Sequence, residues 1–281
     1  MIATSGSQQR VLNIAIFLVL CAGVFIAVAP LLYMASTAFQ GIAYVQPYPP
    51  RLLPETVTLE NFTQAFSSRN FVRAMLNSAG VAIATTGLIT ALASTMAYSF
   101  ARFEFRFKKF IFSALMVMIM IPGVVLLIPQ FILAKNLGLL NSLPGLVLVY
   151  SAGPLAFNTF LLRGFFENLP RELEESAVID GANAFTIFWR VMLPLAAPAI
   201  STVAVFSFLG AWDEYLLALN FLTDENLRTL PIAIANFRGQ HSSNWGLVFA
   251  GSLTAVVPTI LLFIFFQRYF IQGITSGGVR G

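Results

Sequence analysis

The sequence predicts an all-α, polytopic membrane protein with six transmembrane helices. Hydrophobic residues make up 58% of the 281 residues and charged residues only 10%, whereas an ordinary soluble domain carries about 25% charged residues. A soluble fold of this composition would expose large apolar patches to water, and such patches drive aggregation unless lipid covers them. We therefore expect residues 1–281 to form a single transmembrane domain.

Six apolar stretches are each long enough to cross about 30 Å of hydrocarbon, which takes about 20 helical residues. Their approximate limits are 11–34, 74–99, 110–133, 142–164, 196–219 and 247–270. The first stretch exceeds the roughly 7 to 15 apolar residues of a signal-peptide core, so we expect an uncleaved helix.

Prolines and glycines lie well inside several of these spans, which predicts bends in the helices. They are Pro122, Gly123 and Pro129 in the third span, Gly153 and Pro154 in the fourth, and Pro258 in the sixth. Such breaks line translocation paths in some membrane proteins and are packing kinks in others. The sequence leaves both interpretations open.

The distribution of basic residues predicts the orientation in the membrane. The loop after the second span contains Arg102, Arg106, Lys108 and Lys109, whereas the loop after the third span contains only Lys135. Because basic residues in short loops are retained on the cytoplasmic side, we expect the Arg102 loop and both termini to be cytoplasmic. Ten of the sixteen Lys and Arg residues then fall inside.

The residue types that carry most catalytic chemistry are scarce. Cys21 is the only cysteine and His241 the only histidine, so we expect no catalytic residues and no metal site. Neither Lys108 nor Lys109 nor Lys135 follows a glycine, as the lysine of a phosphate-binding loop does. We expect this chain to be no enzyme on its own, and the scattered basic residues indicate no nucleic-acid partner.

The connection between the fourth and fifth spans, residues 165–195, is the most charged part of the chain and is too polar for hydrocarbon. Pro170 suits a first helical position, and the carboxylates of Glu172, Glu174 and Glu175 then complement the positive end of the helix dipole. We expect this helix to run from about residue 171 to 179. Glycine at 181 tolerates the backbone angles of a sharp turn after it.

A second short helix is predicted after that turn. Asn183 is a favourable N-cap, Pro194 ends the helix, and Phe185, Phe188 and Met192 are expected to form one face. The two helices would expose an apolar and acidic surface that has no partner inside the chain. A helix pair resting on lipid headgroups is the alternative, which the acidic residues disfavour because the cytoplasmic leaflet is anionic.

The sequence of this connection resembles the cytoplasmic EAA loop of binding-protein-dependent ABC importer permeases. The resemblance rests on Glu175-Ser176-Ala177, on Asp180-Gly181-Ala182 and on Val191-Met192-Leu193-Pro194 at the family's spacing, with Ser176 in place of the usual alanine. It implies that the loop binds an ATPase subunit. The residues assigned to this role are Glu174, Glu175, Ser176, Ala177, Asp180, Gly181, Phe185, Leu193 and Pro194.

Two other stretches, Trp212 to Leu219 and Gln267 to Gly281, resemble the maltose-type second permease subunit, although Asp213 replaces the family's usual asparagine. The resemblance implies a type I ABC importer permease that forms a sugar path with a second permease. It also implies two ATPase subunits and an extracytoplasmic sugar-binding protein as partners, with membrane lipid around the spans. This chain would hold no cofactor, since ATP and Mg would bind to the ATPase subunits, and it would lie in the inner membrane of a bacterium or archaeon.

Aromatic, amide and carboxylate side chains in the fourth and fifth spans are candidates for the substrate path, because sugar rings and hydroxyls favour such groups. They are Tyr150, Asn158, Trp212, Asp213, Glu214 and Asn220. Packing and interfacial anchoring are the alternative for each, and the two carboxylates can also lie at the wet interface.

Two other functions remain as alternatives. An ion-coupled secondary transporter also has broken helices, but it normally carries ionisable residues near the membrane midplane, and these spans contain almost none. A structural membrane subunit is the second. The external segment 40–68, with four prolines and a predicted short interfacial helix around Phe62, is left without a role.

Overall fold

A computed structural model describes residues 6–41, 53–54, 56–68, 70–239 and 244–277. Within these ranges every regular element is helical, as the sequence predicted. The chain divides into two compact units, which we describe separately: Met1–Arg69 with Ile234–Val256, and Asn70–Ala233 with Val257–Gly281. Helices α12 (Leu230–Ala235) and α13 (Trp245–Gly277) each cross the boundary between the units.

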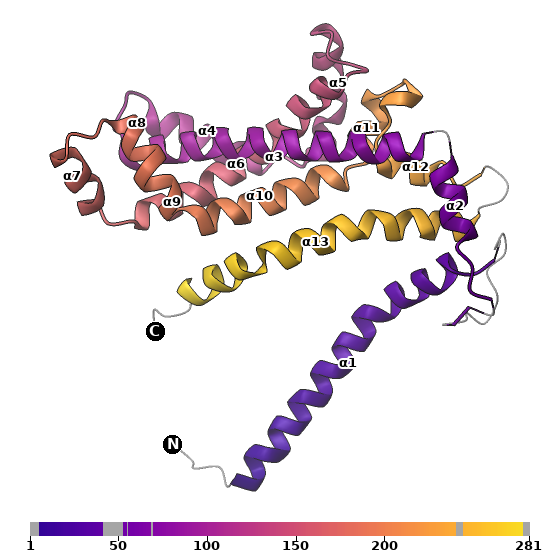
Figure 1. Cartoon of the computed structure of the whole chain (residues 1–281). Coiled ribbons are helices and arrows are strands. Elements are labelled where there is room, and N and C mark those ends of the chain that lie inside the picture. Colours follow the sequence, from indigo (N-terminus) through magenta and orange to yellow (C-terminus); the bar gives the residue numbers. More distant parts are fainter. Residues whose placement is uncertain (1–5, 42–52, 55, 69, 240–243, 278–281) are drawn as a thin grey trace. The chain divides into compact units, whose positions relative to one another are not determined.

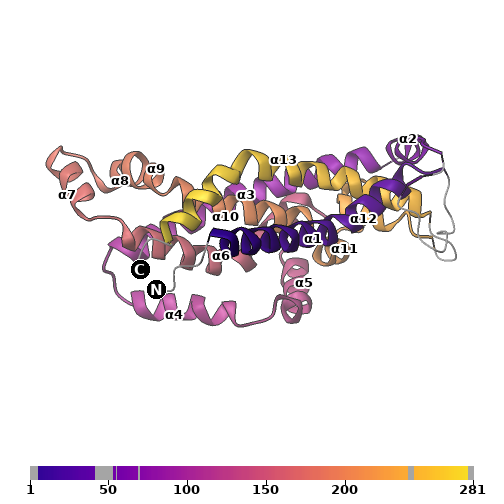
Figure 2. The same ribbon diagram turned by 90° about the horizontal axis from the view of Figure 1, so that it is seen from below.

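Three long helices form the centre of the second unit. They are α3 (Phe71–Arg102), α6 (Leu143–Asn168) and α10 (Ala197–Trp212), and they pack side by side in both views (Figures 1 and 2). Small residues such as Ala82, Ala93 and Ala97 on α3 are fully buried. Small side chains let helix backbones approach closely, which is the usual way of packing helices in lipid.

The predicted third span is broken. It comprises α4 (Lys108–Ile119), a short 3-10 turn η1 (Gly123–Leu126) and α5 (Leu127–Asn136). The two halves are bent by 99°, and Figure 2 shows α5 at a steep angle to α4. Pro122 lies at the break. It interrupts the helix because proline has no N–H to donate and its ring disfavours helical geometry in the residue before it.

A second pair of helices, Ala184–Leu195 and Ala197–Trp212, is bent by 77°, and its break lies at the start of the predicted fifth span. Four helices in the described ranges are long and apolar enough to cross a membrane, and the number is six when each bent pair counts as one span. This agrees with the six predicted transmembrane helices.

Short elements occupy the ends of the second unit. Between α6 and α10 lie α7 (Glu172–Ile179), α8 (Ala184–Ile187), the π-helical turn η2 (Phe188–Met192) and α9 (Leu193–Leu195). After α10 come α11 (Leu216–Phe221) and a 3-10 turn η3 (Glu225–Leu227). Helix α7 lies at one end of the long helices and α11 towards the other (Figure 1).

The first unit contains α1 (Gly6–Ala38), α2 (Glu60–Ser67) and the beginning of α13. Asn61 is fully buried, and its Nδ2 donates to the carbonyls of Ala38, at 3.0 Å, and Gln40, at 2.6 Å. A Cβ atom added to Gly246 would come within 2.5 Å of Asn61 Oδ1. Asn61 therefore fixes the end of α1 against the start of α13. Helix α2 confirms the short helix predicted around Phe62.

Three parts of the sequence discussed above lie outside the described residues. They are most of the proline-rich segment, the loop with His241, and the last four residues of the C-terminal motif.

Candidate functional site: the α6–α10 connection and a membrane cavity

The α6–α10 connection, residues 169–196, begins with the acidic helix α7. Three carboxylates lie in its first turn, where the positive end of the helix dipole stabilises them. The chain then reverses at Gly181, whose φ of +83° is in the left-handed region that favours glycine. Asn183 Oδ1 accepts a hydrogen bond of 2.9 Å from the Thr186 N–H. Both the glycine turn and the asparagine cap confirm the sequence-based predictions.

The prediction that Phe185, Phe188 and Met192 share one face of a helix is wrong. Phe188 and Met192 are buried, whereas Phe185 is 70% exposed. Phe185 lies three residues before Phe188 in α-helical geometry, about 60° around the helix axis, and the π-helical turn η2 begins only at Phe188. The buried face is therefore too narrow to include Phe185.

The inner side of the connection packs into the core of the second unit. Phe188 lies 5.1 Å from the Tyr98 ring, and Tyr98 lies 5.7 Å from Phe166, measured between ring centroids. Ile187 and Met192 belong to the same buried cluster. The connection is therefore held against both α3 and α6 by apolar contacts.

An ion pair adds a second attachment to α3. Arg102 Nε lies 2.5 Å from Glu174 Oε1, with side chains only 6% and 18% exposed. The Arg102 Nη2 also donates to the Leu169 carbonyl at 2.7 Å, and the Tyr98 hydroxyl donates to Glu174 Oε2 at 3.2 Å. Glu174 thus faces inward. Arg102 and Tyr98 were not among the predicted site residues, since a loop arginine and a helix tyrosine gave no sequence signal of pairing with Glu174.

The outer side of the connection carries exposed apolar side chains and acidic residues. Ile179 is 86% exposed, Phe185 and Trp189 are exposed, and the two aromatic rings lie 6.0 Å apart. Glu175 and Asp180 are also exposed. We call Ile179, Phe185 and Trp189 the outer apolar surface. Trp189 was not among the predicted site residues.

The remaining predicted residues of the connection are spread between its two sides. Ser176 is exposed, and its hydroxyl donates to the Glu172 carbonyl at 2.7 Å. Ala177 and Leu193 are half-buried against the core cluster, whereas Pro194 is exposed.

A cavity of about 420 Å³ lies among α3, η1, α5, α6, α10 and α11. Most of its wall is apolar. The polar lining residues are Thr85, Gln130, Tyr150, Asn158, Ser207 and Glu214. Tyr150, Asn158 and Glu214 are therefore brought together at one cavity.

Glu214 lies between α10 and α11, and its carboxylate accepts hydrogen bonds from the start of α11. Its Oε1 accepts from the Leu217 N–H at 2.7 Å, and its Oε2 accepts from the Ala218 N–H at 3.0 Å. The Tyr150 hydroxyl donates to the same Oε2 at 2.5 Å. A carboxylate at a helix start satisfies backbone N–H groups that have no partner within the helix. Glu214 is thus both a helix cap and part of the cavity wall.

The other candidates for the path lie away from this cavity. Trp212 is buried and its ring stacks on Phe208, with centroids 5.8 Å apart. Asp213 is exposed just beyond α10, and Asn220 is exposed with its amide donating to the Leu216 carbonyl. Asn158, by contrast, lies in the cavity wall, with its Nδ2 atom 3.5 Å from Ser207 Oγ. Across the described ranges, no three His, Cys, Asp or Glu residues come close enough to hold a metal.

Comparisons with known proteins identify the family of this helical membrane domain. Residues 85–276 match the family "Binding-protein-dependent transport system inner membrane component", and the chain belongs to this family. It is 34% identical over 277 residues to the sulfoquinovosyl glycerol transport system permease protein SmoH of Agrobacterium fabrum, covering 99% of this chain and 95% of that one. It is 35% identical to the trehalose transport system permease protein SugB of Mycobacterium tuberculosis, over 91% of this chain and 93% of that one.

The fold also matches solved structures. A chain of a bacterial ABC transporter involved in import of the acidic polysaccharide alginate superposes with a TM-score of 0.84 at 22% identity. That alignment covers 96% of this chain and 100% of the other. At this level of identity the comparison establishes the architecture, which is that of an ABC importer permease.

Proposed function

We propose that this chain is one of two permease subunits of an ATP-binding-cassette importer, and that it forms with the second permease the path for a sugar or oligosaccharide. An extracytoplasmic binding protein would deliver the substrate. The family membership and relatives named for trehalose and sulfoquinovosyl glycerol transport support this proposal. The observation that carries the mechanism is the outer apolar surface beside the Gly181 turn.

The outer apolar surface is suited to a cleft on an ATPase subunit. Exposed aromatic and aliphatic side chains clustered at the centre of a patch are typical anchors of protein interfaces. Glu175 and Asp180 next to them supply charges that can pair with basic groups of the partner. Motion of the ATPase would then reach α6 and α10, because both continue directly from the connection.

This mechanism requires no catalysis by the chain itself. ATP and Mg would bind to the ATPase subunits, and no cofactor is needed here. The acidic connection and the Arg102 loop would face the cytoplasm, and both termini would then lie on the inner side of the inner membrane. Rigid-body movement of the helices would expose the path alternately to the two sides.

The 420 Å³ cavity is the part of the path that this chain would contribute. Its apolar wall offers ring faces, and Tyr150, Asn158 and Gln130 offer polar groups to sugar hydroxyls. A cavity of this kind has the mixture of apolar wall and few polar groups that small-molecule sites show.

Reconstituted uptake tests the proposal directly. The complete complex is placed in vesicles containing ATP, and uptake of labelled trehalose and related oligosaccharides is measured for the wild type and an Ile179→Ser, Phe185→Ser variant. Loss of both ATPase association and uptake is expected, because the anchors of the interface are removed. A Val57→Ser variant is the matched control, since Val57 is an equally exposed apolar residue in the predicted external segment.

Two results would contradict the proposal. Normal uptake by the double variant would show that the outer apolar surface is not the contact with the ATPase. Uptake that continues without ATP but stops when an ion gradient is removed would identify a secondary transporter.

A further inference from the structure

A second cavity, of about 580 Å³, lies in the second unit where α3 ends, α4 begins and α6 ends. It is polar, and the cations in its wall are Arg102, Lys108, Lys109, Arg163 and Arg171. Glu104 and Glu167 are the only carboxylates among the lining residues. We call this the basic pocket. It belongs to the end of the long helices that carries the α6–α10 connection, because Arg102 contacts both.

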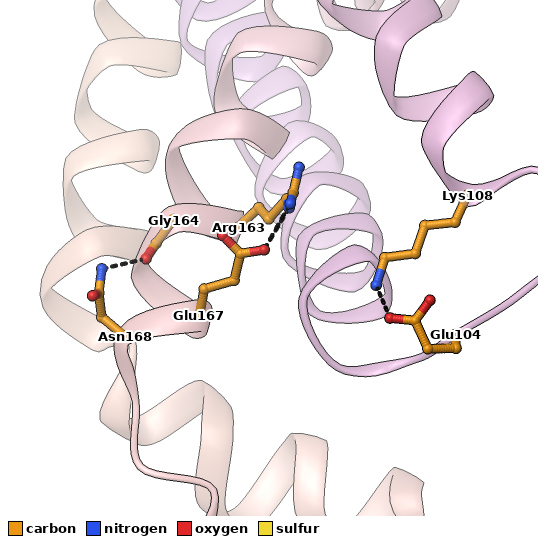
Figure 3. Close-up of polar contacts among 6 residues, drawn as sticks. All are labelled: Glu104, Lys108, Arg163, Gly164, Glu167 and Asn168. Atoms are coloured by element: carbon orange, nitrogen blue, oxygen red, sulfur yellow. Dashed lines mark hydrogen bonds and ion pairs between the residues drawn. The ribbon is translucent and has the colours of Figure 1, made fainter.

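Three of the five cations are already paired. Figure 3 shows Lys108 Nζ donating to Glu104 Oε1 at 2.8 Å, and the Arg163 guanidinium against Glu167, with Nε 2.8 Å from Oε1. Arg102 is paired with Glu174, as described above.

The other two cations have no carboxylate partner within the described part of the chain. They are Lys109 and Arg171, and both lie in the wall of the basic pocket. The pocket therefore retains an excess of positive charge.

Electrostatics at the edge of the pocket agree with this excess. The hydrogen bond from Lys108 and the charge of Lys108 are the main causes that lower the pKa of the exposed Glu104 carboxyl. The charges of Lys109 and Arg171 lower this pKa further. Lys109 and Arg171 therefore lie close enough to Glu104 to act on it.

The start of α4 adds to the same field. Lys108 and Lys109 are the first two residues of this 12-residue helix, its first turn contains no acidic residue, and no side chain caps it. Cations at a helix N-terminus oppose the helix dipole, whereas anions there are stabilised. Phe107 before it has a φ of 65°, which non-glycine residues rarely adopt. An anion bound in the basic pocket would compensate both the lysines and the dipole.

The surface next to the pocket indicates which anion. No residue of α4 is buried, and Phe110, Ile111 and Val117 are exposed along it. A ligand that fills the pocket and continues along α4 needs a negative head and apolar chains. An anionic phospholipid of the inner leaflet has both, and basic pockets at the cytoplasmic ends of membrane helices bind such headgroups.

We propose that the basic pocket binds the phosphate of an anionic phospholipid, held by Lys109, Arg171 and the start of α4, with its acyl chains along α4. Arg171 directly precedes α7, and Arg102 pairs with Glu174 in it. A lipid bound here would therefore hold the first turn of the α6–α10 connection in place.

The test measures lipid selectivity of the full chain, with any subunits that co-purify, in phosphatidylcholine nanodiscs containing a small fraction of spin-labelled phosphatidylglycerol. A K109Q/R171Q variant should lose about thirtyfold in relative affinity, equivalent to about 2 kcal/mol for two cations near the anion. Raising the salt concentration should weaken binding to the wild type, because salt screens exposed charges.

Two control variants make the result decisive. A K135Q/R228Q variant removes the same charge on the predicted external side and should keep the wild-type selectivity. A K109R/R171K variant keeps the charge and should keep the selectivity, which separates binding from loss of folding.

Equal selectivity of wild type and K109Q/R171Q would overturn the proposal. Binding of inorganic phosphate that the wild type shows and K109Q/R171Q lacks, without selectivity for phosphatidylglycerol, would assign the pocket to a free phosphate. A cross-link from Lys109 to a carboxylate of a co-purified chain would assign it to a protein partner. Either result would exclude the lipid as the occupant.

Discussion

Two adjacent glutamates in α7 should behave differently when their charge is removed. Glu174 is paired with Arg102 and accepts from Tyr98, whereas Glu175 is exposed. Glu174→Gln keeps the side-chain shape but replaces the carboxylate with an amide. The Arg102 guanidinium then keeps its bond to the Leu169 carbonyl but loses its compensating negative charge in a site with little access to water.

The magnitude follows from burial. Removing one partner of a fully buried ion pair costs about 3–5 kcal/mol, whereas an exposed pair contributes about 0–1 kcal/mol. Arg102 and Glu174 are 6% and 18% exposed, so the pair is nearer to the buried case. We expect local stability of the α6–α10 connection to fall by about 2–3 kcal/mol.

Hydrogen exchange measures this local stability. Backbone amides of residues 172–180 should exchange about 30- to 150-fold faster in Glu174→Gln, because 1.4 kcal/mol corresponds to a factor of ten. The matched control is Glu175→Gln, which makes the same chemical change one residue away. It should leave exchange unchanged and instead weaken association with the ATPase.

Similar amide exchange rates in the two variants would refute the different roles of Glu174 and Glu175. Equal protection would mean that the Arg102 ion pair does not hold α7 against α3. Faster exchange in Glu175→Gln alone would reverse the assignment of inner and outer glutamates.

Three further variants test other parts of the structure. Gly181→Val should retain membrane insertion but lose ATPase association, because a β-branched residue in left-handed geometry costs about 1–3 kcal/mol; normal co-purification would count against the turn. Glu214→Ala should lower thermal stability by about 0.5–2 kcal/mol through loss of the α11 cap and reduce uptake, whereas unchanged uptake would leave Glu214 with no role in the path. Gly246→Val should lower the thermal midpoint, because its side chain would collide with the buried Asn61 and overpacking costs about 1–3 kcal/mol. The control Gly23→Val adds a side chain in open space, and an equal loss there would contradict the packing argument.

The sequence predicted the membrane class and the layout of the α6–α10 connection because both depend on local features. Apolar length decides where a helix can cross lipid. The Gly181 turn and the Asn183 cap depend on backbone angles and hydrogen bonds within a few residues. Such features can be read without knowledge of the fold.

The predictions that failed depend on partners distant in sequence. Phe188 is buried because it packs on Tyr98, whereas Phe185, one turn earlier, is exposed. Glu174 turned inward because Arg102, 72 positions earlier, lies across from it. Among the candidates for the path, Tyr150 and Glu214 meet at the cavity because the fold brings α6 and α11 together. Residue type alone could not show that these two line the cavity whereas Trp212 and Asn220 do not.

The attachment of α7 to α3 has a mechanical consequence. A segment joined to its neighbours only at its two chain ends can rotate about the line between those ends. A force on the segment then rotates it and does not move the neighbouring helices. Arg102 and the Tyr98 ring provide a third point of support that belongs to neither end. With that rotation blocked, displacement of the connection becomes translation shared by three membrane helices.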